Sequence, residues 1–232
     1  MDLFAAYPQL KACTAPVLAE RKLRLISVAG VIWDAQACYF ALSEERYWVR
    51  TAEGRVQIGV GGLQVPGTPS GEPFRALLAH IRKVWRMQVD YLPSGTLYVL
   101  EGTQFHVLPG ATLLEPTTPA WLQLTPPRLG GGDMPDALVQ AVYWLRLRSA
   151  WQAPRDAMAL RVTLEGLEAF WSVPLWSVRA LREQPWATLY LARPLPAEAQ
   201  LRPVLALQGL RELVQRGAPL LVQKGIPGET GQ

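Results

Sequence analysis

One segment, residues 56–91, constrains the fold of this chain more than any other. Its first residues, Val56 to Val60, read as a strand, and Gly61-Gly62 then leads into a loop rich in proline and glycine. Pro73 opens a run with apolar residues every three or four positions, the spacing of one helix face, and it suits the first helical turn because no hydrogen bond is lost there. We expect 73–86 to form a helix that packs on a sheet through Phe74, Leu77 or Leu78, Ile81, and Val84 or Trp85.

Further strand and helix patterns lie on both sides of this segment. Met87, Val89 and Tyr91 alternate and predict a strand that returns to the sheet. Apolar or alternating runs predict strands at 23–33, 39–42, 47–50, 96–100, 104–108, 121–124, 137–148 and 157–164, and helical patterns lie at 175–183 and 197–216. Residues 185–196 have no regular pattern. The order of these elements predicts an α/β fold with a mixed sheet.

The segment 56–91 also resembles the Nudix box, the signature of the Nudix hydrolase superfamily, G-x5-E-x7-R-E-U-x-E-E-x-G-U with U aliphatic. Gly61-Gly62 is similar to the glycine pair that opens the box, and Gly71-Glu72 is similar to the Gly-Glu that precedes its helix, with three or four residues inserted before it. The glycines of this candidate loop are Gly61, Gly62, Gly67 and Gly71.

Two downstream segments extend the resemblance to roughly residues 24–183. Val139 to Leu147 is similar to the long central strand of the family, and Leu167 to Leu175 is similar to its "E…WVPL" segment. The resemblance implies a Nudix-like α/β/α sandwich with a mixed, curved central sheet. The expected organisation is an N-terminal arm or helix at 1–22, a Nudix-like domain at 23–184 with an insertion around 109–136, and a helical extension at 185–232 packed on the same domain.

The expected box helix lacks the residues that carry the family's chemistry. In Nudix enzymes, glutamates of this helix hold magnesium against a diphosphate, and this hard cation requires oxygen ligands. This chain has no Asp or Glu between Glu72 and Asp90, and it places Arg82, Lys83 and Arg86 there instead. Positive charge at close range repels a divalent cation. We therefore expect a Nudix-like domain without catalytic residues, cofactor or metal.

Two functional classes remain open. In the first, the domain is a binding, scaffold or regulatory module, and Arg82, Lys83 and Arg86 bind an anionic ligand. Its expected partner is a protein, with a nucleotide or nucleic acid as further candidates; Arg146, Arg148 and Arg161 lie on strands expected nearby. In the second, it is a divergent hydrolase of a nucleoside-diphosphate-linked substrate, with Mg²⁺ held by Glu72, Glu165, Glu168 or Glu101.

Composition adds weaker constraints. The formal net charge of +4 permits contact with polyanions without identifying one. Cys13 and Cys38 are the only cysteines and lack metal-ligand spacing, so we interpret both as reduced structural residues, and His80 and His106 as packing or surface residues. No run reaches the roughly 20 apolar residues of a membrane span, and the N-terminal residues do not resemble a signal peptide. A cytoplasmic protein that does not contact membranes is the expectation.

Overall fold

The computed structural model describes residues 23–65, 72–91, 97–101, 104–108, 119–125, 137–196 and 198–203. Several predictions fall outside these ranges: the arm at 1–22, the loop residues Gly67 and Gly71, and the part of the expected terminal helix beyond residue 203. Of the helices in the described ranges, none has the length and apolarity needed to cross a membrane.

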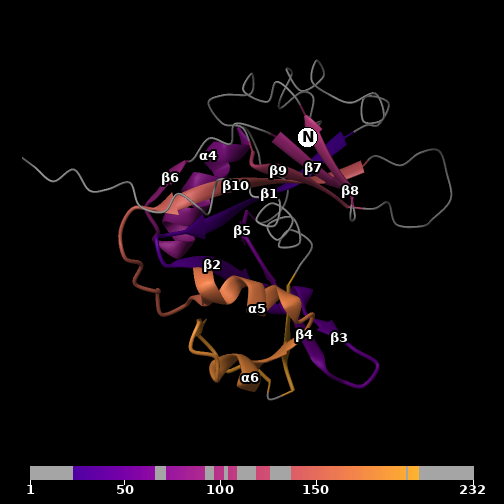
Figure 1. Ribbon diagram of the computed structural model, residues 1–232, viewed down its shortest axis with the longest axis vertical. Helices are drawn as coiled ribbons and strands as arrows, with labels where there is room; N and C mark the ends of the chain where they lie inside the picture. Colours follow the sequence, from indigo (N-terminus) through magenta and orange to yellow (C-terminus); the bar gives the residue numbers. More distant parts are fainter. Residues whose placement is uncertain are drawn as a thin grey trace, which may run out of the picture.

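All described strands belong to one mixed sheet of 14 strands. Its main path runs β12-β14-β4-β2-β1-β10-β9-β7-β8, and the remaining strands pair at its sides (Figure 1). Three pairs are parallel, β1 with β10, β14 with β4 and β7 with β9, and the others are antiparallel. The predicted α/β class with a mixed sheet is confirmed.

The strands are β1 Leu23–Trp33, β2 Ala37–Leu42, β3 Val49–Arg50, β4 Val56–Gly61, β5 Leu63–Gln64, β6 Val89–Tyr91, β7 Leu97–Glu101, β8 Gln104–Leu108, β9 Trp121–Thr125, β10 Ala137–Leu147, β11 Met158–Thr163, β12 Trp176–Ser177, β13 Ala187–Leu191 and β14 Gln200–Pro203.

Strands β1 and β10 form the centre of the sheet and carry apolar residues on both of its faces. Side chains alternate between faces along a strand, so one strand contributes to two cores. In β10, Tyr143 and Leu145 belong to one core, whereas Val142 and Trp144 belong to the other. Burial on both sides explains why these strands read as continuous apolar runs in the sequence.

Each face of the sheet is covered by a different set of helices. Helix α4 (Pro73–His80) and the π-helix η2 (Ile81–Trp85) pack on the face that we call the α4 face. Helices α5 (Leu167–Ser172) and α6 (Val178–Arg182) contribute side chains to the core on the opposite face, the α5 face. Figure 1 shows α4 on one side of β1 and β2, with α5 and α6 on the other.

The expected helix at 73–86 is confirmed as α4 followed by η2. Glu72 caps it, since its two carboxylate oxygens accept hydrogen bonds from the backbone N–H groups of Phe74 and Arg75. The buried residues of the helix are Pro73, Phe74, Leu77, Ile81 and Trp85, whereas Val84 is 46% exposed. The apolar spacing therefore identified the packed face correctly.

Glycine is needed at residue 62, where the chain comes close to β1 just before β5. A Cβ atom on Gly62 would lie 2.9 Å from the carbonyl oxygen of Gly30 in β1, closer than real Cβ atoms approach a backbone atom. This contact requires a residue without a side chain. Gly62 thus has a packing role that follows from the geometry of the described residues.

Two expectations were wrong. Residues 187–191 form β13 within a region expected to be irregular, and 200–203 form β14 where a helix was expected to begin at 197. Pairing of β14 with β4 outweighs the local helical pattern, because β-structure depends on distant partners. The strand expected at 121–124 is confirmed as β9, which lies in the sheet between β10 and β7. Helix α5 had no predicted counterpart.

Candidate functional site

The described residues contain a hollow of about 460 Å³ at the C-terminal end of β10. Two chain segments form it: residues 86–88, which link η2 to β6, and residues 147–155, which link β10 to β11. A backbone hydrogen bond of 3.0 Å from Arg148 to Gln88 joins the two segments. The lining side chains relevant to binding are Arg86, Gln88, Ser149, Trp151, Gln152 and Arg155.

Arg86 lines this hollow and is the residue at which the π-helix η2 ends. Its backbone angles, φ 52° and ψ 30°, are left-handed, and among the described residues it is the only non-glycine residue with positive φ. Glycine usually ends a helix in this way, and a side chain in this conformation costs roughly 1–2 kcal/mol. Strained residues of this kind concentrate at functional sites. The strain at Arg86 therefore singles out its guanidinium group as a candidate functional group.

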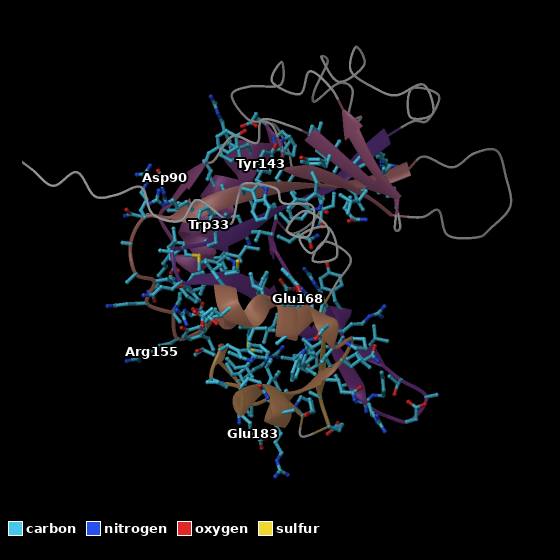
Figure 2. The ribbon with its side chains drawn as sticks, viewed as in Figure 1. Trp33, Asp90, Tyr143, Arg155, Glu168 and Glu183 are labelled. Carbon is cyan, nitrogen blue, oxygen red and sulfur yellow. The ribbon has the colours of Figure 1, made fainter. Side chains whose placement is uncertain are left out.

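Arg155 supplies a second positive charge from the opposite segment of the hollow. Figure 2 shows Arg155 at the periphery of the molecule, on the connection from β10 to β11. Within the described part of the chain, neither Arg86 nor Arg155 has a carboxylate partner within ion-pair distance. The neighbouring Arg148 differs, since its Nε lies 2.6 Å from Oδ1 of Asp90. Two guanidinium groups are thus left to attract an anion.

Trp151 fixes the wall between these two arginines. Its indole Nε1 donates a hydrogen bond of 2.8 Å to the backbone carbonyl oxygen of Trp85, the residue before Arg86. Its ring makes edge-on contacts with Tyr39 and Tyr190, at centroid distances of 5.6 and 5.1 Å. Aromatic contacts of this geometry add to the energy of burial. The hollow is therefore built on a packed aromatic cluster.

The other predicted basic residues do not join this hollow. Arg82 and Lys83 are exposed on η2, and neither lines it. Arg146 is exposed on β10, and Arg161 on β11 donates a long hydrogen bond of 3.5 Å to Gln36. Of the predicted cluster, the structure places only Arg86 in the hollow.

The carboxylates proposed for a relocated metal site are separated by the sheet. Glu72 caps α4 on the α4 face, whereas Glu165 and Glu168 belong to η4 (Leu164–Gly166) and α5 on the α5 face. Figure 2 shows Glu168 at α5. Glu168 accepts a hydrogen bond of 2.9 Å from the indole of Trp171. Glu101 ends β7, and its side chain lies outside what the structure describes. In the described ranges, no three His, Cys, Asp or Glu side chains are grouped to hold a metal ion.

The described His80 and Cys38 occupy packed positions. His80 is half-buried near the end of α4, and burial lowers its pKa while the Glu44 carboxylate opposes that shift. Cys38 is buried and unbridged, and burial raises the pKa of its thiol well above the ordinary range, so the thiol stays protonated. His106 lies in β8, where its side chain is not described, and Cys13 lies outside the described residues.

A second hollow of about 370 Å³ offers a contrast. Its lining includes Glu44, Asp156 and Arg193. Arg193 is already engaged there, with its Nη1 2.6 Å from Oε2 of Glu45 and its guanidinium 5.0 Å from the ring centre of Trp48. Because the cation is paired and two carboxylates line the same space, this hollow does not favour anions.

Comparison of the chain with models of protein families gives no match, and comparison with curated proteins gives none either. The chemistry of the hollow must therefore be argued from its own residues. Sequence reasoning identified Arg86 as an anion-binding candidate but missed Arg155 and Trp151. No local pattern connects Arg155 to a helix end nearly 70 residues earlier in the chain.

Proposed function

We propose that this chain is a non-catalytic, Nudix-like binding module that regulates or scaffolds a partner protein. The hollow between Arg86 and Arg155 takes an anionic group, a phosphate or a carboxylate, displayed by that partner. The observation that carries the proposal is that Arg86 and Arg155 line one hollow, that neither has an ion-pair partner among the described residues, and that Arg86 has a left-handed backbone conformation.

The arrangement of elements supports the Nudix-like α/β/α sandwich within this proposal. Strand β4, the short strand β5, helix α4 with η2, and strand β6 follow one another in the chain, an order that supports the resemblance of this segment to the Nudix box. Helices contribute to the cores on both faces of a mixed sheet. The long strand β10 lies beside β1 at the centre.

The chemistry of the lining favours recognition of a phosphate or carboxylate. A guanidinium group binds such anions through paired, parallel hydrogen bonds, which are shorter and stronger than neutral ones. Gln88, Ser149 and Gln152 add neutral hydrogen-bonding groups around the two arginines. The hollow is shallow and open, so it suits an anionic side chain on a larger molecule. Arginine clusters recognise phosphorylated and acidic motifs in this way.

The alternative of a hydrolase with relocated magnesium has less support. Catalysis of diphosphate hydrolysis by a metal ion needs several oxygen ligands in one place. Glu72 is occupied as a helix cap, and the sheet separates it from Glu165 and Glu168. The binding module is therefore the better proposal for the described residues.

Binding of two synthetic peptides tests the proposal. One peptide carries a central phosphoserine and the other a central glutamate in the same sequence, and affinities are measured by calorimetry for the whole chain and for a double variant, Arg86→Gly with Arg155→Gln. We expect saturable binding that is lost in the double variant and weakens as salt rises. A matched control, Arg46→Gln with Arg75→Gln, removes two exposed charges elsewhere. Equal affinity for the two double variants would overturn the proposal.

A further inference from the structure

The strand β13 leaves one edge of the sheet open among the described residues. It pairs with β11 on one side only. Backbone hydrogen bonds run from Thr163 to Trp186 and from Ala192 to Ala157, and both join residues that lie directly opposite each other. In an antiparallel pair, such bonded positions alternate along the strand. Thr188 and Tyr190 therefore direct their backbone groups toward β11, and Ala187, Leu189 and Leu191 direct theirs outward.

This outward edge lacks the usual protection against pairing. Exposed strand edges in proteins are commonly protected by charged residues, proline or extreme shortness. The five residues of β13, Ala-Thr-Leu-Tyr-Leu, contain no charge and no proline. The N–H of Ala187 is used within a turn, where it donates to Gln184. In the described part of the chain, no turn or loop hydrogen bond reaches the outward groups of Leu189 and Leu191.

The edge is complementary to itself. Two copies of β13 related by a two-fold axis at Leu189 run antiparallel, which is the closed symmetry of most protein dimers. Each Leu189 then exchanges N–H and carbonyl groups with the Leu189 of the second copy. Each Leu191 N–H faces the carbonyl of Ala187 of the second copy, a group that the turn to Gln184 leaves free. Of the outward groups, only the Leu191 carbonyl is left without a partner, because the Ala187 N–H that faces it already donates to Gln184.

The side chains fit the same register. Leu189 and Leu191 are half-buried at the margin of the α5-face core. Pairing places Leu189 beside its copy and Leu191 beside Ala187, which continues that core across the junction. Arg193, the nearest charge beyond the strand, is held by Glu45 at 2.6 Å, so no unpaired like charges oppose each other.

We propose that the chain forms a two-fold homodimer by antiparallel pairing of β13 with β13 of a second copy, joining two sheets into one. Two of the other described edges, β3 and β12, are less suited, since each is two residues long. This dimer involves neither Arg86 nor Arg155, and it holds independently of the proposed anion site.

Disulfide trapping of the whole chain tests the register directly. In a bonded antiparallel pair, the Cα atoms lie about 5.5 Å apart, within the range that a disulfide spans. In a Cys13→Ser background, Leu189→Cys should form a covalent dimer under mild oxidation. Leu191→Cys is the matched control, because it faces Ala187 of the second copy and should cross-link far less.

Solution mass supplies the second measurement. Sedimentation and light scattering should give a dimer for the unaltered chain and a monomer for Leu189→Lys, which places two ammonium groups against each other. Val84→Lys, an equivalent change at an exposed apolar residue on η2, should leave the dimer intact. A monomer at every concentration tested overturns the proposal. So does a dimer in which Leu189→Cys and Leu191→Cys cross-link equally, since the interface then lies elsewhere or has another register.

Discussion

The indole Nε1 of Trp151 donates a hydrogen bond of 2.8 Å to the backbone carbonyl oxygen of Trp85. This bond ties the end of the helix at 73–85 to the connection between β10 and β11. Arg86 follows Trp85 in the chain, and Arg155 lies on the same connection as Trp151. Together with the backbone hydrogen bond from Arg148 to Gln88, this contact joins the two segments that carry the arginines, and the proposed anion site depends on it.

Replacement of Arg86 by glycine should increase the stability of the fold and weaken binding of the anion. Glycine adopts positive φ without strain, so we expect Arg86→Gly to raise the free energy of unfolding by roughly 1 kcal/mol. The same change removes a guanidinium group and should weaken binding of the phosphoserine peptide at least tenfold, since bonds to charged groups contribute roughly 1.5–3 kcal/mol. Urea denaturation and calorimetry measure the two effects.

Arg82→Gly is the control for this pair of measurements. It lies within η2, where glycine costs about 1 kcal/mol, so the variant should be less stable yet bind the peptide normally. Loss of stability in Arg86→Gly would show that the strain argument is wrong.

Trp151→Phe should reduce both the stability of the fold and the affinity of the proposed anion site. The variant keeps an aromatic ring and loses the hydrogen bond to Trp85, for an expected loss of about 1 kcal/mol in unfolding free energy. Because this bond aligns the two segments, peptide affinity should also fall. Trp48→Phe is a matched control, since Trp48 donates an equivalent bond of 2.8 Å to the carbonyl oxygen of Ser43, far from Arg86 in sequence. Equal affinity in the two variants would contradict a supporting role for Trp151.

Metal-dependent hydrolysis should be absent. With either Mg²⁺ or Mn²⁺, we expect no turnover of ADP-ribose, NADH, dinucleoside polyphosphates or nucleoside triphosphates, and no large thermal stabilisation by Mg²⁺ alone. Glu72→Ala should cost about 0.5–2 kcal/mol in stability through loss of the helix cap. Robust turnover that disappears in Glu165→Gln or Glu168→Gln would reinstate the hydrolase.

His80 should make stability depend on pH in a defined direction. Burial lowers the pKa of His80 in the folded protein, against the opposing effect of Glu44. As pH falls, His80 is therefore protonated in the unfolded chain before it is protonated in the folded protein. The contribution of neutral His80 to the free energy of unfolding is complete above about pH 6.5 and is lost as pH falls toward the folded-state pKa. His80→Gln should reduce the loss of unfolding free energy between neutral and mildly acidic pH, measured by urea denaturation. If His80→Gln leaves the pH dependence of the unfolding free energy unchanged, His80 does not contribute to it.

Local pattern was sufficient for the helix at 73–85 and for the long central strands. Their periodicity reflects which faces are buried, and that information lies within each segment. Strand β14 was missed because it exists through pairing with β4, more than 140 residues earlier in the chain. Arg155 was missed for a related reason, since its segment is joined to that of Arg86 by contacts between residues distant in sequence, such as that of Trp151 with Trp85. Properties that depend on distant pairing are absent from a local reading.

The most direct test of the anion site is a titration of the whole chain with inorganic phosphate, followed through the arginine Nε–Hε signals in heteronuclear NMR spectra. Arg86 and Arg155 should shift together along one saturable curve, because they contact the same anion. Arg148, paired with Asp90, and the exposed Arg75 should respond weakly or not at all. A uniform, non-saturating response of all exposed arginines, with Arg86 and Arg155 indistinguishable from Arg75, would contradict the account.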